Sequence, residues 1–331
     1  MLALVASIFF VLPLTLLAQS TSQHSDAALA VAKKLLYDGQ SDSARDHLKA
    51  AIAIDKTNSE LWFWLALANV NLNEIKDAVT AFETSIELNP NFADAHEGLA
   101  DALLRSSRLA VASDEARKAL ELKPEYPLAH YTLAFINFRA RRVADTVSEA
   151  DAAIAQDPSF ADAYLLKAQA LINLYSTTTG LDDETKARYA ELRASAAEPL
   201  RKYCELTTNP TKAEIWGYVA NNLDVDQPPQ PSTQINIFSG KEVTTKARLI
   251  SKPEPQYTEE ARRYQVQGRI VLKAVFASSG RVTNIRVFET LPAGLTEQAI
   301  RAARAIQFTP AVLDGTPVSM WIQLEYNFNL F

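Results

Sequence analysis

Cysteine and histidine are scarce in this chain of 331 residues, and their scarcity excludes several kinds of chemistry. Cys204 is the only cysteine, so no disulfide can form within the chain, and no lipoprotein cleavage site follows the N-terminal run. The four histidines all lie in the first 130 residues: His24, His47, His96 and His130. Segment 240–331 has neither residue type, which removes Cys–His and Ser–His nucleophile pairs and zinc sites from it.

Glycine-rich loops and clusters of positive charge are missing as well. The chain has 9 glycines and a formal net charge of −6, and no phosphate-binding glycine motif occurs in it. No group of lysines and arginines is interleaved with aromatic residues, as nucleic-acid binding would require. The acidic run Asp182 to Glu184 is typical of a solvated helix start, and His96 and His130 are expected to be packing residues. We therefore predict no catalytic residues, no metal, no cofactor and no nucleic-acid partner.

An uncharged apolar run opens the chain. Residues 2–18 contain no charged side chain, and about 17 residues is close to the shortest length that spans a bilayer. The run predicts a signal peptide that ends at Ala18, although no lysine or arginine precedes it and Leu16 is large for a cleavage site. An uncleaved membrane anchor is the alternative, and the sequence leaves both open.

A 34-residue repeat follows this run. Pro90, Pro124 and Pro158 are 34 residues apart, and each ends a helical segment. Aligning back from them gives four regular units, one stretched unit and a capping helix, within an array over 25–223: 25–58, 59–92, 93–126, 127–160, 161–212 and 212–223. Alanine recurs at the eighth position of the units, where a small residue lets two helices pack closely. The pattern is similar to the tetratricopeptide repeat (TPR), because an ordinary helical bundle has no reason to keep this period.

Such arrays present a concave groove lined by the first helix of each pair. The repeat register predicts these groove residues: Phe63, Leu67, Glu97, Asp101, Tyr131, Phe135, Phe138, Arg139 and Leu165. The aromatic rings between Tyr131 and Phe138, together with Arg139, form the best candidate for a peptide-binding patch. The same rings can instead pack between repeats, and the sequence does not separate the two possibilities.

The last part of the chain changes in pattern. Residues 224–239 are polar and proline-rich, which predicts an extended linker before a final domain over 240–331. Residues 241–250 are expected to add a strand to the sheet of that domain. Alternating apolar residues from Arg269 to Phe276 predict a strand with one buried face, and a turn at Gly280 leads to a second strand.

Two helices and a closing strand complete this domain. Thr258 is placed to cap a short helix that ends near Tyr264, and Thr296 is a plausible cap for a helix that follows Leu295. Period-two alternation from Met320 onward predicts a final strand. The predicted class is multidomain: an all-α tetratricopeptide-repeat solenoid followed by a small α+β domain with an antiparallel sheet and two helices.

The final domain resembles the TonB C-terminal domain over roughly a quarter of the chain. The ordered positions that carry the resemblance are Pro255, Tyr257, Ala261, Arg262, Gly268, Gly280, Leu295, Ala299, Phe308, Pro310, Ala311 and Gly315. Two residues depart from the family pattern: Thr258 stands where proline is usual, and Thr296 where aspartate is usual. Threonine still caps a helix, so we expect the fold to tolerate both.

The resemblance implies a domain that binds a segment of an outer-membrane receptor or another envelope protein by strand addition. Strand pairing uses backbone groups and needs few specific side chains. We place this edge along Ser319 to Phe328, and the residues expected at it or beside it are Glu254, Gln256, Tyr257, Ser319, Met320, Trp321, Ile322, Gln323, Leu324, Glu325 and Tyr326. The apolar members are expected to contribute to the sheet core as well.

Two functions of different classes fit the sequence. One is a TonB-like energy transducer in the cell envelope, anchored in the inner membrane and facing the periplasm, whose repeats bind a further protein. The alternative is a soluble exported TPR scaffold with no energy-transducing role. Processing at Ala18 separates them, because transduction by this chain alone requires a retained anchor. The short linker also raises the question of whether the domain reaches the outer membrane.

Overall fold

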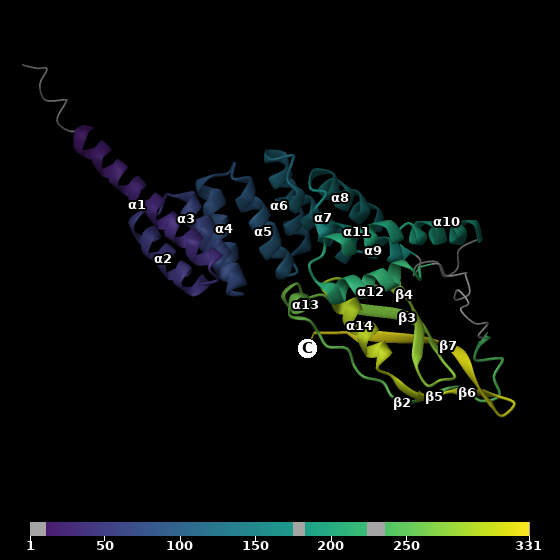
Figure 1. Cartoon of the computed structure of the whole chain (residues 1–331). Coiled ribbons are helices and arrows are strands. Elements are labelled where there is room, and N and C mark those ends of the chain that lie inside the picture. Colours follow the sequence, from purple (N-terminus) through teal and green to yellow (C-terminus); the bar gives the residue numbers. More distant parts are fainter. Residues whose placement is uncertain (1–10, 175–182, 224–235, 331) are drawn as a thin grey trace, which may run out of the picture. The chain divides into compact units, whose positions relative to one another are not determined.

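The computed structural model describes residues 11–174, 183–223 and 236–330 (Figure 1). The chain divides into two compact units, Met1–Thr132 and Leu133–Phe331. Within the described ranges, no helix is both long enough and apolar enough to cross a membrane. The predicted signal or anchor run lies partly outside these ranges, and its described part forms the start of the first helix.

Paired helices build the first unit. They are α1 (Val11–Tyr37), α2 (Ser41–Ile54), α3 (Ser59–Asn71), α4 (Ile75–Leu88), α5 (Ala93–Arg105), α6 (Leu109–Leu122) and the beginning of α7 (Pro127–Arg139). The alanines at the eighth and twentieth repeat positions are fully buried, for example Ala66 and Ala78. The small side chains therefore lie at the contacts between helices, as the repeat register predicts.

In the second and third repeats, the residue at the fourth position anchors the turn that enters the helix pair. Trp62 Nε1 donates to the carbonyl of Lys56 at 3.0 Å, six residues earlier. His96 Nε2 lies 3.0 Å from the carbonyl of Pro90, again six residues earlier, and its Nδ1 lies 2.7 Å from Glu115. Both ring nitrogens of His96 thus have structural partners, which explains why a polar residue can be buried at this position.

Gly98 on α5 is required by the neighbouring repeat. A Cβ at this position would lie 2.5 Å from the ring of Phe82, which is fully buried on α4. We therefore expect Gly98→Ala to lower the free energy of unfolding by about 1–3 kcal/mol through overpacking. Urea denaturation would measure this change, and Phe82→Leu in the same chain should recover part of it. Additive losses in the double variant would contradict the proposed contact.

The second unit begins with the remaining repeat helices. After α7 come α8 (Val143–Gln156), α9 (Ala161–Leu174), α10 (Asp183–Ala194), α11 (Ala197–Leu206) and α12 (Pro210–Ala220). The Asn209 side chain caps α12 by accepting from Lys212 N at 3.0 Å, and Pro210 occupies its first turn. Trp216 of α12 is fully buried, so this last helix closes an apolar layer.

Two sheets and two helices complete the unit. They comprise β1 (Ile237–Phe238), β2 (Arg248–Ser251), α13 (Glu259–Arg263), β3 (Gly268–Phe276), β4 (Val282–Glu289), α14 (Leu295–Arg304), β5 (Gln307–Thr309), β6 (Ala311–Leu313) and β7 (Thr316–Phe328). The strand order is β1-β7-β3-β4, with β6 also paired to β7. The predicted class, a helical repeat array followed by a small α+β domain, is confirmed.

The register of β3 agrees with its alternating sequence. Ile270, Leu272, Ala274 and Phe276 are all fully buried on one face. The ring of Phe276 stacks on Phe308 with centroids 4.0 Å apart, which joins β3 to the segment after α14. The core of the domain therefore lies on the face that the period-two pattern selects.

Three local expectations have different outcomes. Thr258 caps α13, because its Oγ1 accepts from Ala261 N at 3.0 Å. Thr296 is not the cap of α14: Gly294, with φ 79°, holds that position, and Thr296 Oγ1 bonds Leu291 instead. The strand expected in 241–250 is also placed differently, because β2 pairs with β5 in a separate two-stranded sheet.

Candidate functional site

Strand β7 has one fully paired side and one partly open side. Its residues 320–328 pair with β3 in continuous antiparallel register. On the other side, β1 pairs in parallel with Ser319 and Met320, while β6 pairs with residues 316–318 beyond the end of β3. Along 321–328, the described residues include no strand on that side. We call this stretch the β7 margin.

The prediction that the open edge starts at Ser319 is therefore wrong by two residues. Ile237 and Phe238, which were assigned to the linker, form β1 and cover Ser319 and Met320. A β-branched residue followed by an aromatic residue favours a strand, although two residues are too few to give a period-two signal. Ser319 is buried, and its Oγ also accepts from Ser278 N at 3.1 Å.

The backbone of the β7 margin alternates in direction. Ala277 N donates to Arg281 O in the β3–β4 hairpin, so the backbone groups of Ala277 point toward β4. Backbone groups alternate in direction along a strand, so those of the even-numbered β3 residues, such as Phe276, point toward β7. Because these residues pair with even-numbered β7 residues, the odd-numbered ones present N–H and C=O outward. The carbonyl of Glu325 agrees with this assignment, since it accepts from Lys252 Nζ at 2.8 Å. Trp321, Gln323, Glu325 and Asn327 are therefore the residues that an added strand would pair with.

The side chains of this margin divide between core and surface. Leu324 and Tyr326 are buried, while Gln323 and Glu325 are exposed; Trp321 and Ile322 are intermediate. Leu324 and Tyr326 thus contribute to the sheet core, whereas Trp321 and Ile322 remain partly accessible. An added strand would meet exposed side chains and outward backbone groups, which is the arrangement that strand addition uses.

An extended segment before α13 lies beside the margin without pairing to it. Lys252 Nζ is 4.5 Å from the centroid of the Tyr326 ring, and the ring of Tyr257 contacts Phe328 with centroids 5.6 Å apart. Burial raises the pKa of Tyr326 to about 12, with a smaller contribution from the nearby Glu254 carboxylate.

The other residues predicted beside the edge fall into two groups. Tyr257 is partly fixed by its hydroxyl, which donates to Val266 O. Glu254 and Gln256 are exposed. The structure therefore places all three predicted residues in the segment that flanks the margin, with Gln256 free to contact an incoming chain.

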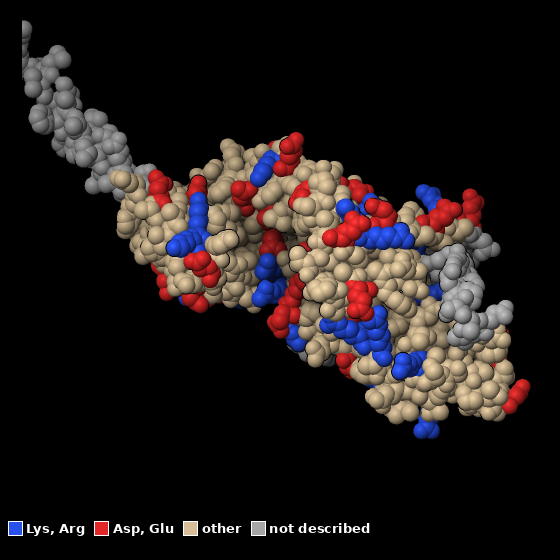
Figure 2. Space-filling view, in the orientation of Figure 1, with Lys and Arg blue, Asp and Glu red and all other residues tan. Residues whose placement is uncertain are grey.

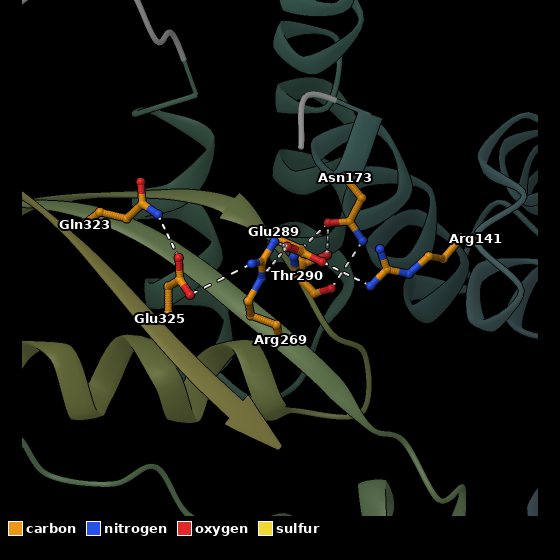
Figure 3. A network of polar contacts seen from close by, with 7 residues as sticks. All are labelled: Arg141, Asn173, Arg269, Glu289, Thr290, Gln323 and Glu325. Carbon is orange, nitrogen blue, oxygen red and sulfur yellow. Dashed lines mark hydrogen bonds and ion pairs between the residues drawn. The ribbon is translucent and has the colours of Figure 1, made fainter. Parts of the chain in front are cut away.

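A polar network crosses the exposed face of the sheet (Figure 3). Gln323 donates to Glu325 at 2.8 Å, and Glu325 lies 3.9 Å from Arg269. Arg269 in turn holds the buried carboxylate of Glu289 at 2.9 Å, and Arg141 reaches the same carboxylate at 3.2 Å. Side chains of the margin are thus connected through ion pairs to the turn that follows α7.

The opposite edge of the sheet, along β4, is covered by helices of the same unit. Tyr218 of α12 accepts from Ile285 N at 2.9 Å, and Arg193 of α10 donates to Val287 O. Arg193 is fully buried and also lies over the ring of Phe288, 4.8 Å from its centroid. These side chains satisfy backbone groups that an edge strand would otherwise expose. Among the described residues, such cover of the β7 margin is limited to Lys252 Nζ, which donates to Glu325 O.

Helix α9 closes the end of β4. Asn173 Oδ1 accepts from Thr290 N at 2.7 Å, and Asn173 Nδ2 donates to Thr290 O at 3.2 Å. Gln169 Nε2 donates to Leu291 O at 3.3 Å from a buried position. Helix α9 thus binds the chain's own sheet domain through Gln169 and Asn173.

The predicted groove patch on α7 also contacts the chain's own sheet domain. The ring of Phe135 contacts Tyr264 with centroids 5.1 Å apart, and Arg139 Nη1 donates to Tyr264 O at 2.8 Å. Phe135 and Phe138 are buried. Of the two arrangements that the sequence left open, packing within the chain holds at Phe135 and Phe138, because the turn after α13 occupies this patch. Leu165 on α9 is half-buried.

The groove residues of the first unit are divided between core and surface. Phe63 packs against Phe82 and Phe92, with the Phe92 ring centroid 4.9 Å away. Leu67, Asp101 and Tyr131 are half-buried, and Asp101 pairs with Arg105 at 2.7 Å. Glu97 is buried and accepts from Thr132 at 3.0 Å. Burial raises the pKa of Glu97 to about 8, and the neighbouring Asp101 adds to the shift.

Several residues that hold the sheet domain were not singled out from the sequence. Trp216 was expected only as part of a capping helix, yet its Nε1 donates to Glu297 Oε1 at 2.9 Å inside the unit. Arg193 and Asn173 carried no sequence signal, because they lie in the stretched repeat where the 34-residue register is lost. A buried tryptophan near the end of an array is a signal that could have indicated a docked domain.

Comparison with known proteins agrees with this architecture. Residues 253–330 match the family model "Gram-negative bacterial TonB protein C-terminal", and residues 68–127 match a tetratricopeptide repeat model. Residues 253–330 are a TonB C-terminal domain. Both matched families are protein-interaction domains.

One relative and several solved structures are similar to parts of the chain. Protein TonB of Salmonella typhimurium is 33% identical over 61 residues, which cover 18% of this chain and 25% of that protein. The chain therefore spans a quarter of this relative's length. A MamA fragment of Desulfovibrio magneticus RS-1 is 19% identical, covering 55% of this chain and 94% of its own, with a TM-score of 0.44. PilF of Pseudomonas aeruginosa is 16% identical, covering 60% and 90%, with a TM-score of 0.45.

Proposed function

We propose that this chain is a TonB-like component of the cell envelope that captures an extended segment of a partner protein. The partner segment adds as a strand to the β7 margin, opposite Trp321, Gln323, Glu325 and Asn327. The proposal rests chiefly on one observation: within the described residues, this margin presents outward backbone groups and has no strand beside it.

The TonB C-terminal match supports the class of partner. An outer-membrane receptor with a short extended segment on its periplasmic side is the partner that we propose. The chain acts in the periplasm, either after export or from an inner-membrane anchor at residues 2–18. The repeats of the first unit bind a further protein through surface around Tyr131 and Asp101, which are half-buried rather than buried.

A second candidate function is a soluble exported scaffold without an energy-transducing role. The contacts of α9, α10 and α12 with β4 favour it, because they bind the sheet domain to the repeats rather than leaving it on a long free tether. N-terminal sequencing of the protein from envelope fractions decides between them. A mature chain that begins at Gln19 and stays soluble supports the scaffold, and retention of Met1 in the inner membrane supports transduction.

Strand addition is tested by proline at an outward position of the β7 margin. Gln323→Pro removes an outward N–H while leaving the inward pairing of Leu324 in place, so the fold should persist. We expect it to weaken capture of the partner at least ~10-fold, since it removes a backbone hydrogen bond and adds a clash. Gln323→Val is the matched control, because it changes the side chain and keeps the N–H.

The measurement is photocrosslinking in envelopes of the source cells, with a photoreactive residue at Asn327 of the full chain. The expected product is a crosslink to the periplasmic segment of an outer-membrane protein, which Gln323→Pro removes and Gln323→Val retains. A photoreactive residue at the exposed Thr283 on β4 should give no such product. Equal crosslinking in the proline and valine variants would refute strand addition.

A further inference from the structure

A cavity lies in the sheet domain, away from the β7 margin. It has a volume of about 530 Å³ and is formed where the β3–β4 hairpin meets α12 and α14. Its walls include Tyr218, Arg281, Asn284, Arg304 and Ile306. No lining residue belongs to β7, and the volume is within the range of roughly 300–1,000 Å³ that is usual for small-molecule sites.

Asn284 has an unusual backbone conformation at this cavity. Its φ is 50°, in the left-handed region that few residues other than glycine adopt. The pairing of β3 with β4 shifts register here, since Lys273 pairs with Arg286 but Val275 pairs with Thr283. Two residues of β4 therefore face one residue of β3. Such a bulge changes the direction of a side chain, and here it coincides with the cavity wall.

The amide of Asn284 is an unused donor. Its Nδ2 atom is buried and has no hydrogen-bond partner within the described part of the chain. A buried donor without a partner costs about 1–3 kcal/mol, so a fold has little reason to keep both this donor and the left-handed backbone. Because Nδ2 has almost no accessible surface in the structure, an acceptor in the cavity relieves that cost by drawing the amide toward it.

Positive charge surrounds the same space. Arg304 of α14 lies over the ring of Tyr218, 5.4 Å from its centroid, and the hydroxyl of Tyr218 is itself fixed by Ile285 N. Glu214 is the nearby acid, and its carboxylate is 3.5 Å from Arg304. Both side chains of that pair are partly exposed, so the pair is weak and competes little with another anion. Arg281, in the hairpin turn, is exposed on the other side of the cavity.

Figure 2 shows blue side chains gathered over the α12 and α14 part of this unit, with an acidic group beside them. Guanidinium groups form forked hydrogen bonds with carboxylate and phosphate oxygens. The ring of Tyr218 and the side chain of Ile306 add apolar wall to the same space. The cavity thus combines donors for an oxyanion with surface for a small apolar body.

We propose that this cavity binds a small organic anion. Its carboxylate or phosphate head accepts hydrogen bonds from Asn284 Nδ2, Arg281 and Arg304, and its apolar body packs against Tyr218 and Ile306. The site is independent of partner capture, because none of these residues lies on the β7 margin.

Binding is tested on the full chain with three probes that share one ring: benzoate, phenyl phosphate and benzyl alcohol. The backbone amide of Thr283, which lines the cavity, is followed by NMR during each titration. We expect saturable shifts with at least one of the two anions in the millimolar range and none with the neutral alcohol. The anion that binds more tightly identifies the head group as carboxylate or phosphate.

Three variants test the residues. Asn284→Gly removes the amide and tolerates the positive φ, whereas Arg281→Gln and Arg304→Gln each remove one cation. Each should weaken binding of the anion about tenfold, the usual effect of losing one charge-assisted hydrogen bond. Arg248→Gln on β2 is the control for loss of an exposed positive charge elsewhere and should leave binding unchanged.

Three results would overturn the proposal. They are the absence of saturable shifts with both anions, equal binding of benzyl alcohol, and unchanged affinity in the three cavity variants. Arg281→Gln lies in an exposed turn and should not disturb folding, so its affinity remains informative even if Asn284→Gly is unstable.

Discussion

Replacing Trp216 with alanine is expected to destabilise the second unit by about 3–5 kcal/mol. The Trp216 side chain is fully buried on α12, and its Nε1 donates to Glu297 of α14. The substitution leaves a cavity between the last repeat helix and the sheet domain. It also leaves the Glu297 carboxyl, 3% exposed, without this donor, which adds to the cost.

Trp216→Phe is the matched control, because it keeps most of the buried ring and removes only the hydrogen bond. We expect it to cost about 1–3 kcal/mol, clearly less than alanine. Urea denaturation of the full chain, followed by fluorescence of the remaining tryptophans, measures both variants. If the alanine variant loses less than about 1 kcal/mol, the repeats and the sheet domain do not form one folded unit in solution.

Glu97→Gln is expected to stabilise the first unit at alkaline pH and to flatten its pH dependence. In the folded chain, burial raises the pKa of Glu97 from its ordinary value of 4.5 to about 8. Between these values the folded state holds a proton that the unfolded state releases, so stability falls as pH rises from about 4.5 to 8. Removing the ionisable group should therefore recover about 4 kcal/mol at pH 8 and little at pH 4.

The groups around Glu97 act in both directions. Asp101 and Asp94 disfavour its charge, while Thr132 and Arg105 favour it. Glutamine keeps an oxygen that can accept from Thr132, so the hydrogen bond survives the substitution. Urea denaturation at several pH values between 4 and 8 gives the test, with exposed Glu87→Gln as the charge control. Parallel pH profiles for Glu97→Gln and the unsubstituted chain would contradict the buried-acid account.

The repeats and the strands of the final domain were predictable because their signals are local and periodic. The small residues at fixed repeat positions, such as Ala66 and Ala100, are buried where the 34-residue register places them. The alternating residues of β3 likewise form its buried face. Each of these depends on a spacing that one helix or one strand sets by itself.

The contacts between the repeats and the sheet domain could not be predicted in this way. Arg139 and Phe135 fit a groove pattern equally well whether the occupant is a foreign peptide or the turn at Tyr264. Their partners lie more than a hundred residues away, and no periodic pattern connects the two segments. For the same reason the sequence did not show that β1 covers the start of the predicted edge.

The location of the open edge was predicted in part. The final strand was identified, and residues 321–326 of the predicted set lie on the β7 margin. Which backbone groups point outward depends on the pairing of β3 with both of its neighbours, which is tertiary information. The side chains that cover β4, Tyr218 and Arg193, follow from the same tertiary arrangement.

Hydrogen exchange at the β7 margin tests the central claim most directly. The backbone amides are measured in the free full chain and again with the crosslinked partner segment supplied as a synthetic peptide. We predict that the amides of Gln323 and Asn327 exchange rapidly in the free chain and become protected on binding, whereas Leu324 and Tyr326 are protected in both states. Outward amides that are already protected without the peptide, or that stay unprotected with it, would contradict strand addition at this edge.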